Sequence, residues 1–135
     1  MTTTFEVREA MAEAITDGTG LRASSLFTDT VNAPIAIVMR QEFDPRFVFS
    51  GVKSVYQYQV TIYVDRVNER AGQIALDEYV ETTGAASVIA AIQDEDNWPA
   101  DLIDYAQVTN VSAVSAVAVN ESQYLAVALD VEVCF

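Results

Sequence analysis

The chain has 135 residues, of which 51% are hydrophobic and 20% are charged, with 20 acidic residues against 7 basic ones and no histidine. This length suits a single domain over residues 1–135, and the apolar content is too high for a disordered chain. The formal net charge of −13 argues against partners that bind by phosphate neutralisation, such as nucleic acid or anionic lipid.

The first predicted element is a helix over residues 4–17. Thr3 and Glu6 have the spacing of a capping box, which satisfies free amide groups at a helix start. Gly18 and Gly20 end the helix, because glycine readily adopts the left-handed conformation of a C-terminal cap. Between them, apolar residues recur at helical spacing and form one stripe. The stripe consists of Val7, Met11, Ala14 and Ile15.

Two strands are predicted next. Residues 21–33 read as irregular, and Pro34 opens a short apolar strand over residues 35–39, since proline is tolerated at the first position of a strand. Residues 41–50 form a long connection before a second strand over residues 54–65. Alternation in this strand predicts one face on the core, carrying Tyr56, Tyr58, Val60, Ile62 and Val64, and a second face carrying Gln57, Gln59, Thr61 and Tyr63.

A second helix is predicted over residues 68–81, followed by a shorter helix over residues 85–93 and a polar loop over residues 94–99. The last third reads as a β-hairpin with its turn at residues 120–122. Valines between positions 108 and 119 favour a strand, although their spacing by three leaves a helical alternative for part of it. The final strand alternates most regularly, with Leu125, Val127, Leu129, Val131 and Val133 on one face.

This order of elements predicts an α+β fold. We expect a mixed or antiparallel sheet of about four strands, with two main helices and one short helix packed on one face.

Charge is unevenly distributed along the chain. Residues 1–70 contain 9 acids and 7 bases, whereas residues 71–135 contain 11 acids and no base. The acids of the second half must be solvated, paired with bases of the first half, or presented to a partner. They can serve as a solubilising surface. Alternatively, they form a surface that must not hold a polyanion, or one that seeks a basic partner.

Enzyme and metal motifs are not found. Without histidine there is no histidine-based triad or zinc site, and the glycines form no phosphate-binding loop. Cys134 is the only cysteine, which excludes cysteine-rich metal sites and an intramolecular disulfide. The run 94–96 could bind a hard cation, but it lacks the glycine and distal glutamate of a calcium loop, so a solvated loop is the simpler reading. We expect no catalytic residue, cofactor or metal.

No targeting segment or membrane span is predicted. The amino terminus carries charges where a signal peptide needs an apolar core, and the longest uncharged run, residues 105–120, is too short and polar to span a bilayer. These features predict a soluble, intracellular protein.

The connection between the first two strands contains a candidate interface. Three phenylalanines lie there beside three basic residues, and aromatic residues next to arginine are typical of protein–protein hot spots. The alternative is a strand pair whose phenylalanines pack inward. The candidate residues are Arg40, Phe43, Arg46, Phe47, Phe49 and Lys53. If copies associate, the first half of one subunit could meet the acidic second half of the next, a head-to-tail contact that can close into a ring.

Four segments resemble the tail terminator proteins of long-tailed bacteriophages and their prophages, the lambda-like class. FEVREAMAEAI with the following TDGTGLRA resembles their first helix and its glycine exit. VNAPIAIVM resembles a short strand of the family, and YQYQVTIYVDRVNERAGQIALDEYV resembles its long strand running into the second helix. The ending YLAVALDVEV resembles its final strand.

The resemblance implies a structural virion protein. Such proteins form hexameric rings that cap the tail tube, stop its polymerisation and offer a docking surface to the head connector, while DNA passes through without specific binding. The implied partners are a second copy of the chain, the tail tube protein and the connector. An acidic lumen or partner face would suit this role, with Asp94, Glu95, Asp96, Asp130 and Glu132 as candidates.

Three other functions remain open at this point. The chain could be another neck component such as a head–tail joining protein, a monomeric cellular protein-binding module, or an enzyme.

Overall fold

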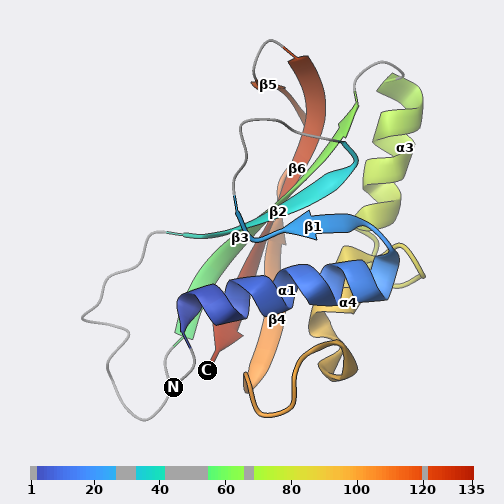
Figure 1. Cartoon of the computed structure of the whole chain (residues 1–135). Coiled ribbons are helices and arrows are strands. Elements are labelled where there is room, and N and C mark those ends of the chain that lie inside the picture. The colour runs from blue at the N-terminus through green and yellow to red at the C-terminus, as the bar shows by residue number, and fades with distance from the viewer. Residues whose placement is uncertain (1–2, 27–32, 42–54, 66–68, 120–121) are drawn as a thin grey trace.

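Helices and strands follow each other in an order close to the predicted one. The computed structural model describes residues 3–26, 33–41, 55–65, 69–119 and 122–135. The elements, shown in Figure 1, are α1 (Thr4–Thr19), β1 (Arg22–Ser24), β2 (Ile35–Arg40), β3 (Val55–Asp65), α3 (Glu69–Tyr79), α4 (Val88–Gln93), the 3-10 turn η1 (Glu95–Asn97), β4 (Tyr105–Val111), β5 (Ser115–Val119) and β6 (Ser122–Cys134). The predicted α+β class is confirmed.

The sheet is built around the long strand β6. Strand β3 pairs with one side of β6 from Val55↔Cys134 to Asp65↔Tyr124, while β4 and β5 pair with successive parts of its other side. Beyond β3 the sheet continues through β2 to β1, and among the described strands only the β1–β2 pair is parallel. A mixed sheet was therefore the correct prediction.

The described residues form a sheet of six strands, so the expectation of about four was too low. Strand β1 has three residues and lies in the segment that was predicted to be irregular. The strand expected in the hairpin is two strands, β4 and β5, separated by residues 112–114. A register shift between Val108 and Asn110 also interrupts β4. The helical alternative for this valine-rich region is wrong, because both parts pair with β6.

One face of the sheet forms the hydrophobic core. The predicted apolar faces of β3 and β6 meet there through pairs such as Val60↔Leu129 and Ile62↔Val127, and all four side chains are buried. Their alternation places every second residue on this face, as predicted. The opposite face carries the polar residues of the same strands.

Helix α1 covers part of the core face. Thr3 and Glu6 form the predicted capping box, and Gly20 ends the helix in the left-handed conformation with a φ of 78°. The helix is two residues longer than predicted. Its buried side includes Val7, Met11 and Ile15, which belong to the same core cluster as the inner residues of β3 and β6.

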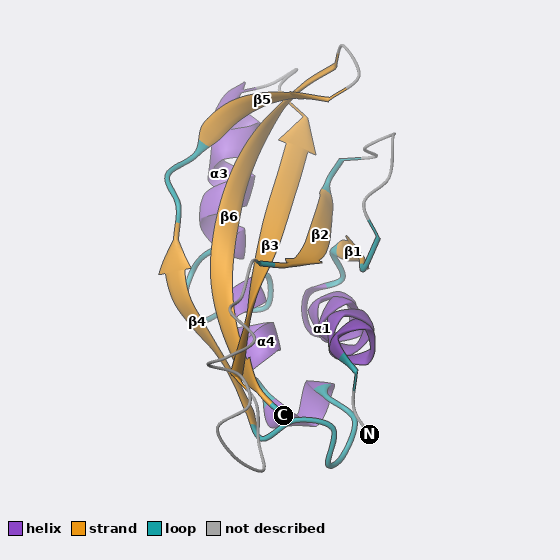
Figure 2. Ribbon diagram, turned by 90° about the vertical axis from the view of Figure 1, so that its left-hand side faces the viewer, coloured by secondary structure: helices purple, strands orange, loops and turns teal. Residues whose placement is uncertain are grey.

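The other two helices lie on the same face, so the predicted one-sided packing is correct. A Cβ placed on Gly72 of α3 would lie 3.3 Å from Val64 Cγ2 and 3.3 Å from Leu125 Cδ1, both on the core face. Helix α4 is shorter than predicted because Ser87 caps it, accepting a hydrogen bond from Ala90 N at 3.0 Å. In Figure 2, α3 and α4 lie behind β5, β6 and β3, whose outer face is turned to the viewer.

The length and hydropathy of the described helices do not reach what a bilayer-spanning helix needs.

Candidate functional site

The outer, helix-free face of the sheet carries two of the predicted acidic residues. Asp130 and Glu132 lie on β6 at alternate positions and are half-buried. Asp130 pairs across the sheet with Gln59 of β3, and Glu132 pairs with Gln57. Strand register thus places both carboxylates beside glutamines of β3, near the C-terminal end of β6.

Neutral side chains hold these carboxylates. Gln41 Nε2 donates to Asp130 Oδ1 at 2.6 Å, and Asn110 Nδ2 approaches Asp130 Oδ2 at 3.5 Å. Gln57 Nε2 lies 3.5 Å from Glu132 Oε1. Such donors satisfy a carboxylate oxygen without cancelling its charge. Both charges are therefore positioned and remain uncompensated by these partners.

Tyr105, the first residue of the edge strand β4, contacts one of these carboxylates. Its hydroxyl donates to Glu132 Oε2 at 3.3 Å. Partial desolvation, reinforced by the charge of Glu132 and by this hydrogen bond, raises the pKa of the Tyr105 hydroxyl above its usual value. At neutral pH Tyr105 therefore stays a proton donor to Glu132. Neither Tyr105 nor the amide donors Gln41, Gln57 and Asn110 were predicted as part of a site.

The remaining predicted acids lie elsewhere, between α4 and β4. Glu95 and Asp96 line a hollow of about 530 Å³. Asp94 has a structural role instead, because its carboxylate accepts a hydrogen bond from Asp96 N at 3.0 Å and caps η1. The predicted acidic surface is thus two surfaces, one on the sheet and one at this hollow.

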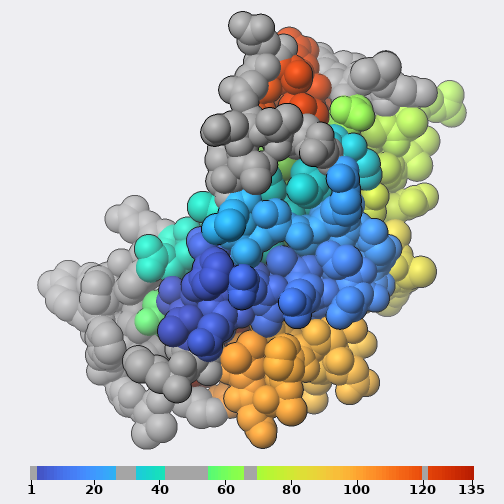
Figure 3. All heavy atoms as spheres, in the orientation of Figure 1, coloured from blue at the N-terminus to red at the C-terminus, as the bar shows by residue number. Residues whose placement is uncertain are grey.

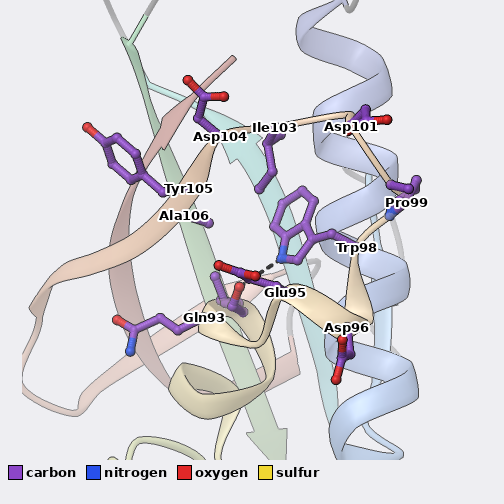
Figure 4. A pocket seen from close by; sticks show the side chains of 12 residues that line it. Gln93, Glu95, Asp96, Trp98, Pro99, Asp101, Ile103, Asp104, Tyr105 and Ala106 are labelled. Carbon is purple, nitrogen blue, oxygen red and sulfur yellow. Dashed lines mark hydrogen bonds between the residues drawn. The ribbon is translucent and has the colours of Figure 1, made fainter.

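The buried Trp98 lies at the floor of the hollow. Its Nε1 donates to Ile92 O at 2.7 Å, which fixes the orientation of the buried ring. Figure 4 shows Ile103 beside the ring and the carboxylates of Glu95, Asp101 and Asp104 on different sides of it. We call this group of residues, with Asp96, the acidic hollow.

Sequence reasoning missed two of its acids, Asp101 and Asp104. Both lie in a segment without regular structure, and Asp101 has a positive φ of 63°, a conformation that aspartate tolerates better than most residues. No periodic pattern marks such a position. The only available signal was the absence of bases after Arg70, since no lysine or arginine can lie among residues that come entirely from the second half.

A basic surface lies at the start of α1. Of the six predicted interface residues only Arg40 falls in the described part of the chain; Phe43, Arg46, Phe47, Phe49 and Lys53 lie outside the described residues. Arg40, at the end of β2, shares a shallow hollow with Phe5, Arg8 and Met39. The Arg8 guanidinium carbon lies 5.3 Å from the centre of the Phe5 ring, within the range of a cation–π contact.

One nitrogen of Arg8 has no hydrogen-bond partner among the described residues. This Nε is buried, and no described side chain or backbone group accepts from it. Phe5 and Met39, which line the same hollow, are 42% and 37% exposed. We call Phe5, Arg8, Met39 and Arg40 the Arg8 surface.

The described residues contain no cluster of side chains suited to binding a metal ion. Within residues 3–26, 33–41, 55–65, 69–119 and 122–135, no group of three or more acidic or cysteine side chains is arranged to hold a metal ion.

Comparison with known proteins gives no further identification: no protein-family model matches the chain, and no curated protein matches it.

Proposed function

We propose that this chain is a tail terminator protein of a long-tailed bacteriophage or prophage. In this role it forms a ring, hexameric in the family it resembles, that caps the tail tube, ends tube polymerisation and provides the docking surface for the head connector. It acts in the neck of the virion, without catalysis or a cofactor. Its partners are further copies of itself, the tube protein and the connector.

The observation that carries the proposal is the outer face of the sheet. Asp130 and Glu132 are held there by amide and hydroxyl donors, so their position is defined while their charge is kept. A surface of fixed negative charge repels a polyanion. A protein that encircles DNA during its release needs such a surface, because basic or charge-neutral walls would slow the passage of the duplex.

The positions of the four segments that resemble tail terminator proteins also support the proposal. They fall on α1, on β2, on β3 with α3, and on β6, and these elements form the centre of the fold. The acidity of residues 71–135 is further support for the proposal, since β6 and the acidic hollow both belong to that half of the chain.

Deletion of the gene from the phage or prophage that encodes it tests the proposal. We expect tails of uncontrolled length without heads, because nothing would end polymerisation of the tube, and we expect restoration of the normal length by the wild-type chain supplied in trans. Tail lengths are measured by electron microscopy of the lysate. Headless tails of normal length would contradict the proposal and indicate a head–tail joining protein. Normal particles would exclude both roles.

A further inference from the structure

We propose that the Arg8 surface of one subunit docks into the acidic hollow of the next copy. This inference rests on the proposed ring, since it names the contact between neighbouring subunits. The occupant of the hollow is thus a second copy of this chain, presenting the first turns of α1 and the end of β2.

The Arg8 surface has the composition of a binding hot spot. Arginine, methionine and aromatic residues are enriched at the centres of protein interfaces. Here Phe5 and Met39 are exposed and share a hollow with Arg8 and Arg40. Arginine forms charge-assisted hydrogen bonds to carboxylates, which are among the stronger ones in proteins.

The acidic hollow offers the complementary features. Its floor includes the buried Trp98 and the half-buried Ile103, which suit an aromatic or methionine side chain, and its rim carries Glu95, Asp96, Asp101 and Asp104. The hydrogen bond from Trp98 to Ile92 fixes the floor before any partner binds. Less side-chain ordering is then needed on association.

The two surfaces are formed by different residues of the subunit. Phe5 and Arg8 belong to the first turns of α1, whereas Gly18 near its last turn lies against Ala91 of α4 and Asn97 of η1, next to the hollow. Ten residues of helix separate Arg8 from Gly18, a rise of about 15 Å at 1.5 Å per residue. In Figure 3 the start of α1 (dark blue) borders the segment around residues 95–104 (orange) on the surface of the subunit.

A contact between different surfaces is heterologous, and heterologous contacts close into rings when the rotation permits. The residues that line the hollow include four acids and no base. Complementary charge on a second copy would set the register of neighbouring subunits.

Charge exchange between two variants tests the inference. Variant A carries Arg8→Glu, and variant B carries Glu95→Lys with Asp101→Lys. Each alone should self-associate at least about tenfold more weakly than the wild-type chain, because like charges then meet at every contact. An equimolar mixture should recover the wild-type association, since A and B alternate with opposite charges at each contact. Sedimentation velocity over a concentration series measures this, with circular dichroism to verify folding.

Two matched controls carry similar charge changes elsewhere. Arg70→Glu lies on the exposed side of α3, and Glu13→Lys lies on the exposed side of α1. Both should associate like the wild-type chain. If Arg8→Glu fails to fold, Phe5→Ala replaces it and should weaken association without a partner that restores it.

Three results would overturn the inference: a mixture that associates no better than its components, controls that weaken association as much as A or B, or a wild-type chain that stays monomeric at millimolar concentration. The proposed function and the proposed subunit contact can fail independently of each other. If deletion of the gene leaves tail length normal while A and B still complement each other, the contact stands and the tail role does not. If tails lose length control but charge exchange has no effect, the role stands and the contact does not.

Discussion

The inner and outer faces of β3 and β6 are stabilised in different ways. On the inner face Val60, Ile62 and Leu129 are completely buried or nearly so against the helices, and their contribution is apolar burial. On the outer face Gln57, Asp130 and their neighbours are held by side-chain hydrogen bonds at 2.6 to 3.5 Å. The same two strands therefore carry the core on one side and the charged surface on the other.

This difference indicates which face of β3 and β6 tolerates substitution with a smaller loss of stability. A buried leucine contributes on the order of 1.5–3 kcal/mol through removal of apolar surface from water. A half-exposed hydrogen bond contributes about 1 kcal/mol net, because the same groups bond to water in the unfolded chain. The outer face can thus be specialised for charge at little expense to the free energy of unfolding.

The largest expected effect is at the centre of the inner face. Leu129→Ala should lower the free energy of unfolding by about 2–5 kcal/mol, because it leaves a cavity where the side chain is fully buried. Thr61→Ala, on the outer face of β3, is the control and should change it by at most about 0.5 kcal/mol. Urea denaturation measures both. Similar losses in the two variants would contradict the division of the sheet into a core face and a surface face.

The next effect concerns the contact between α1 and α4. A Cβ added at Gly18 would lie 2.5 Å from Ala91 Cβ, so Gly18→Ala should destabilise the protein by about 1–3 kcal/mol through overpacking. The gain in helix propensity from alanine offsets part of this. Adding Ala91→Gly should recover stability, which chemical denaturation of the double variant would reveal. Strictly additive losses would show that the two positions are not in contact.

A smaller effect is expected from the hydroxyl of a buried tyrosine on the inner face. Tyr58 OH donates to Thr4 O at 3.1 Å and anchors the start of α1. Tyr58→Phe should therefore cost about 1 kcal/mol at neutral pH, as measured by denaturant titration.

The difference in stability between the wild-type chain and Tyr58→Phe should depend on pH. Burial, with a smaller contribution from Tyr56, raises the pKa of the Tyr58 hydroxyl above its ordinary value of 10.0. Above that pH the unfolded chain loses the proton while the folded chain keeps it, so stability falls as pH rises. The phenylalanine variant lacks this loss, and the difference between the two proteins should narrow above pH 10. A constant difference up to alkaline unfolding would contradict the burial of this hydroxyl.

The smallest effect on folding is expected on the outer face. Asp130→Asn with Glu132→Gln removes two charges while keeping the size of both side chains. We expect a change in the free energy of unfolding of at most about 1 kcal/mol, because only half-exposed hydrogen bonds are altered. If this face lines a DNA passage, particles carrying the variant should keep their tail length but release DNA more slowly after triggering in vitro. Unchanged release would remove the outer face from the proposed passage.

Most of the fold could be predicted because its signals are local. The capping box of α1 and the alternation of β3 and β6 identify elements from neighbouring residues alone. The three-residue strand β1 gave no such signal, since a strand this short exists only through its pairing with β2. The division of residues 105–119 into β4 and β5 was equally hidden, because the bulge and break follow from pairing with β6.

The candidate sites were predictable in part. The acids of β6 and of the segment after α4 were recognised from the absence of bases, but their partners were not. Gln41 and Asp130 are 89 positions apart in the chain, and nothing in the sequence joins them. Arg8 is not part of the apolar stripe predicted for α1, and its place beside Arg40 follows only from the packing of α1 on β2.

By itself the sequence determined which residues of β3 and β6 face inward, where α1 begins, and that the second half carries the negative charge. These properties depend on spacing along the chain and on composition. Tertiary structure decided where α3 and α4 begin and end, which acids share a surface, which of them are held by neutral donors, and which residues form the Arg8 surface and the acidic hollow. Those relations depend on contacts between residues far apart in the chain, and such contacts form only when the sheet and helices pack together.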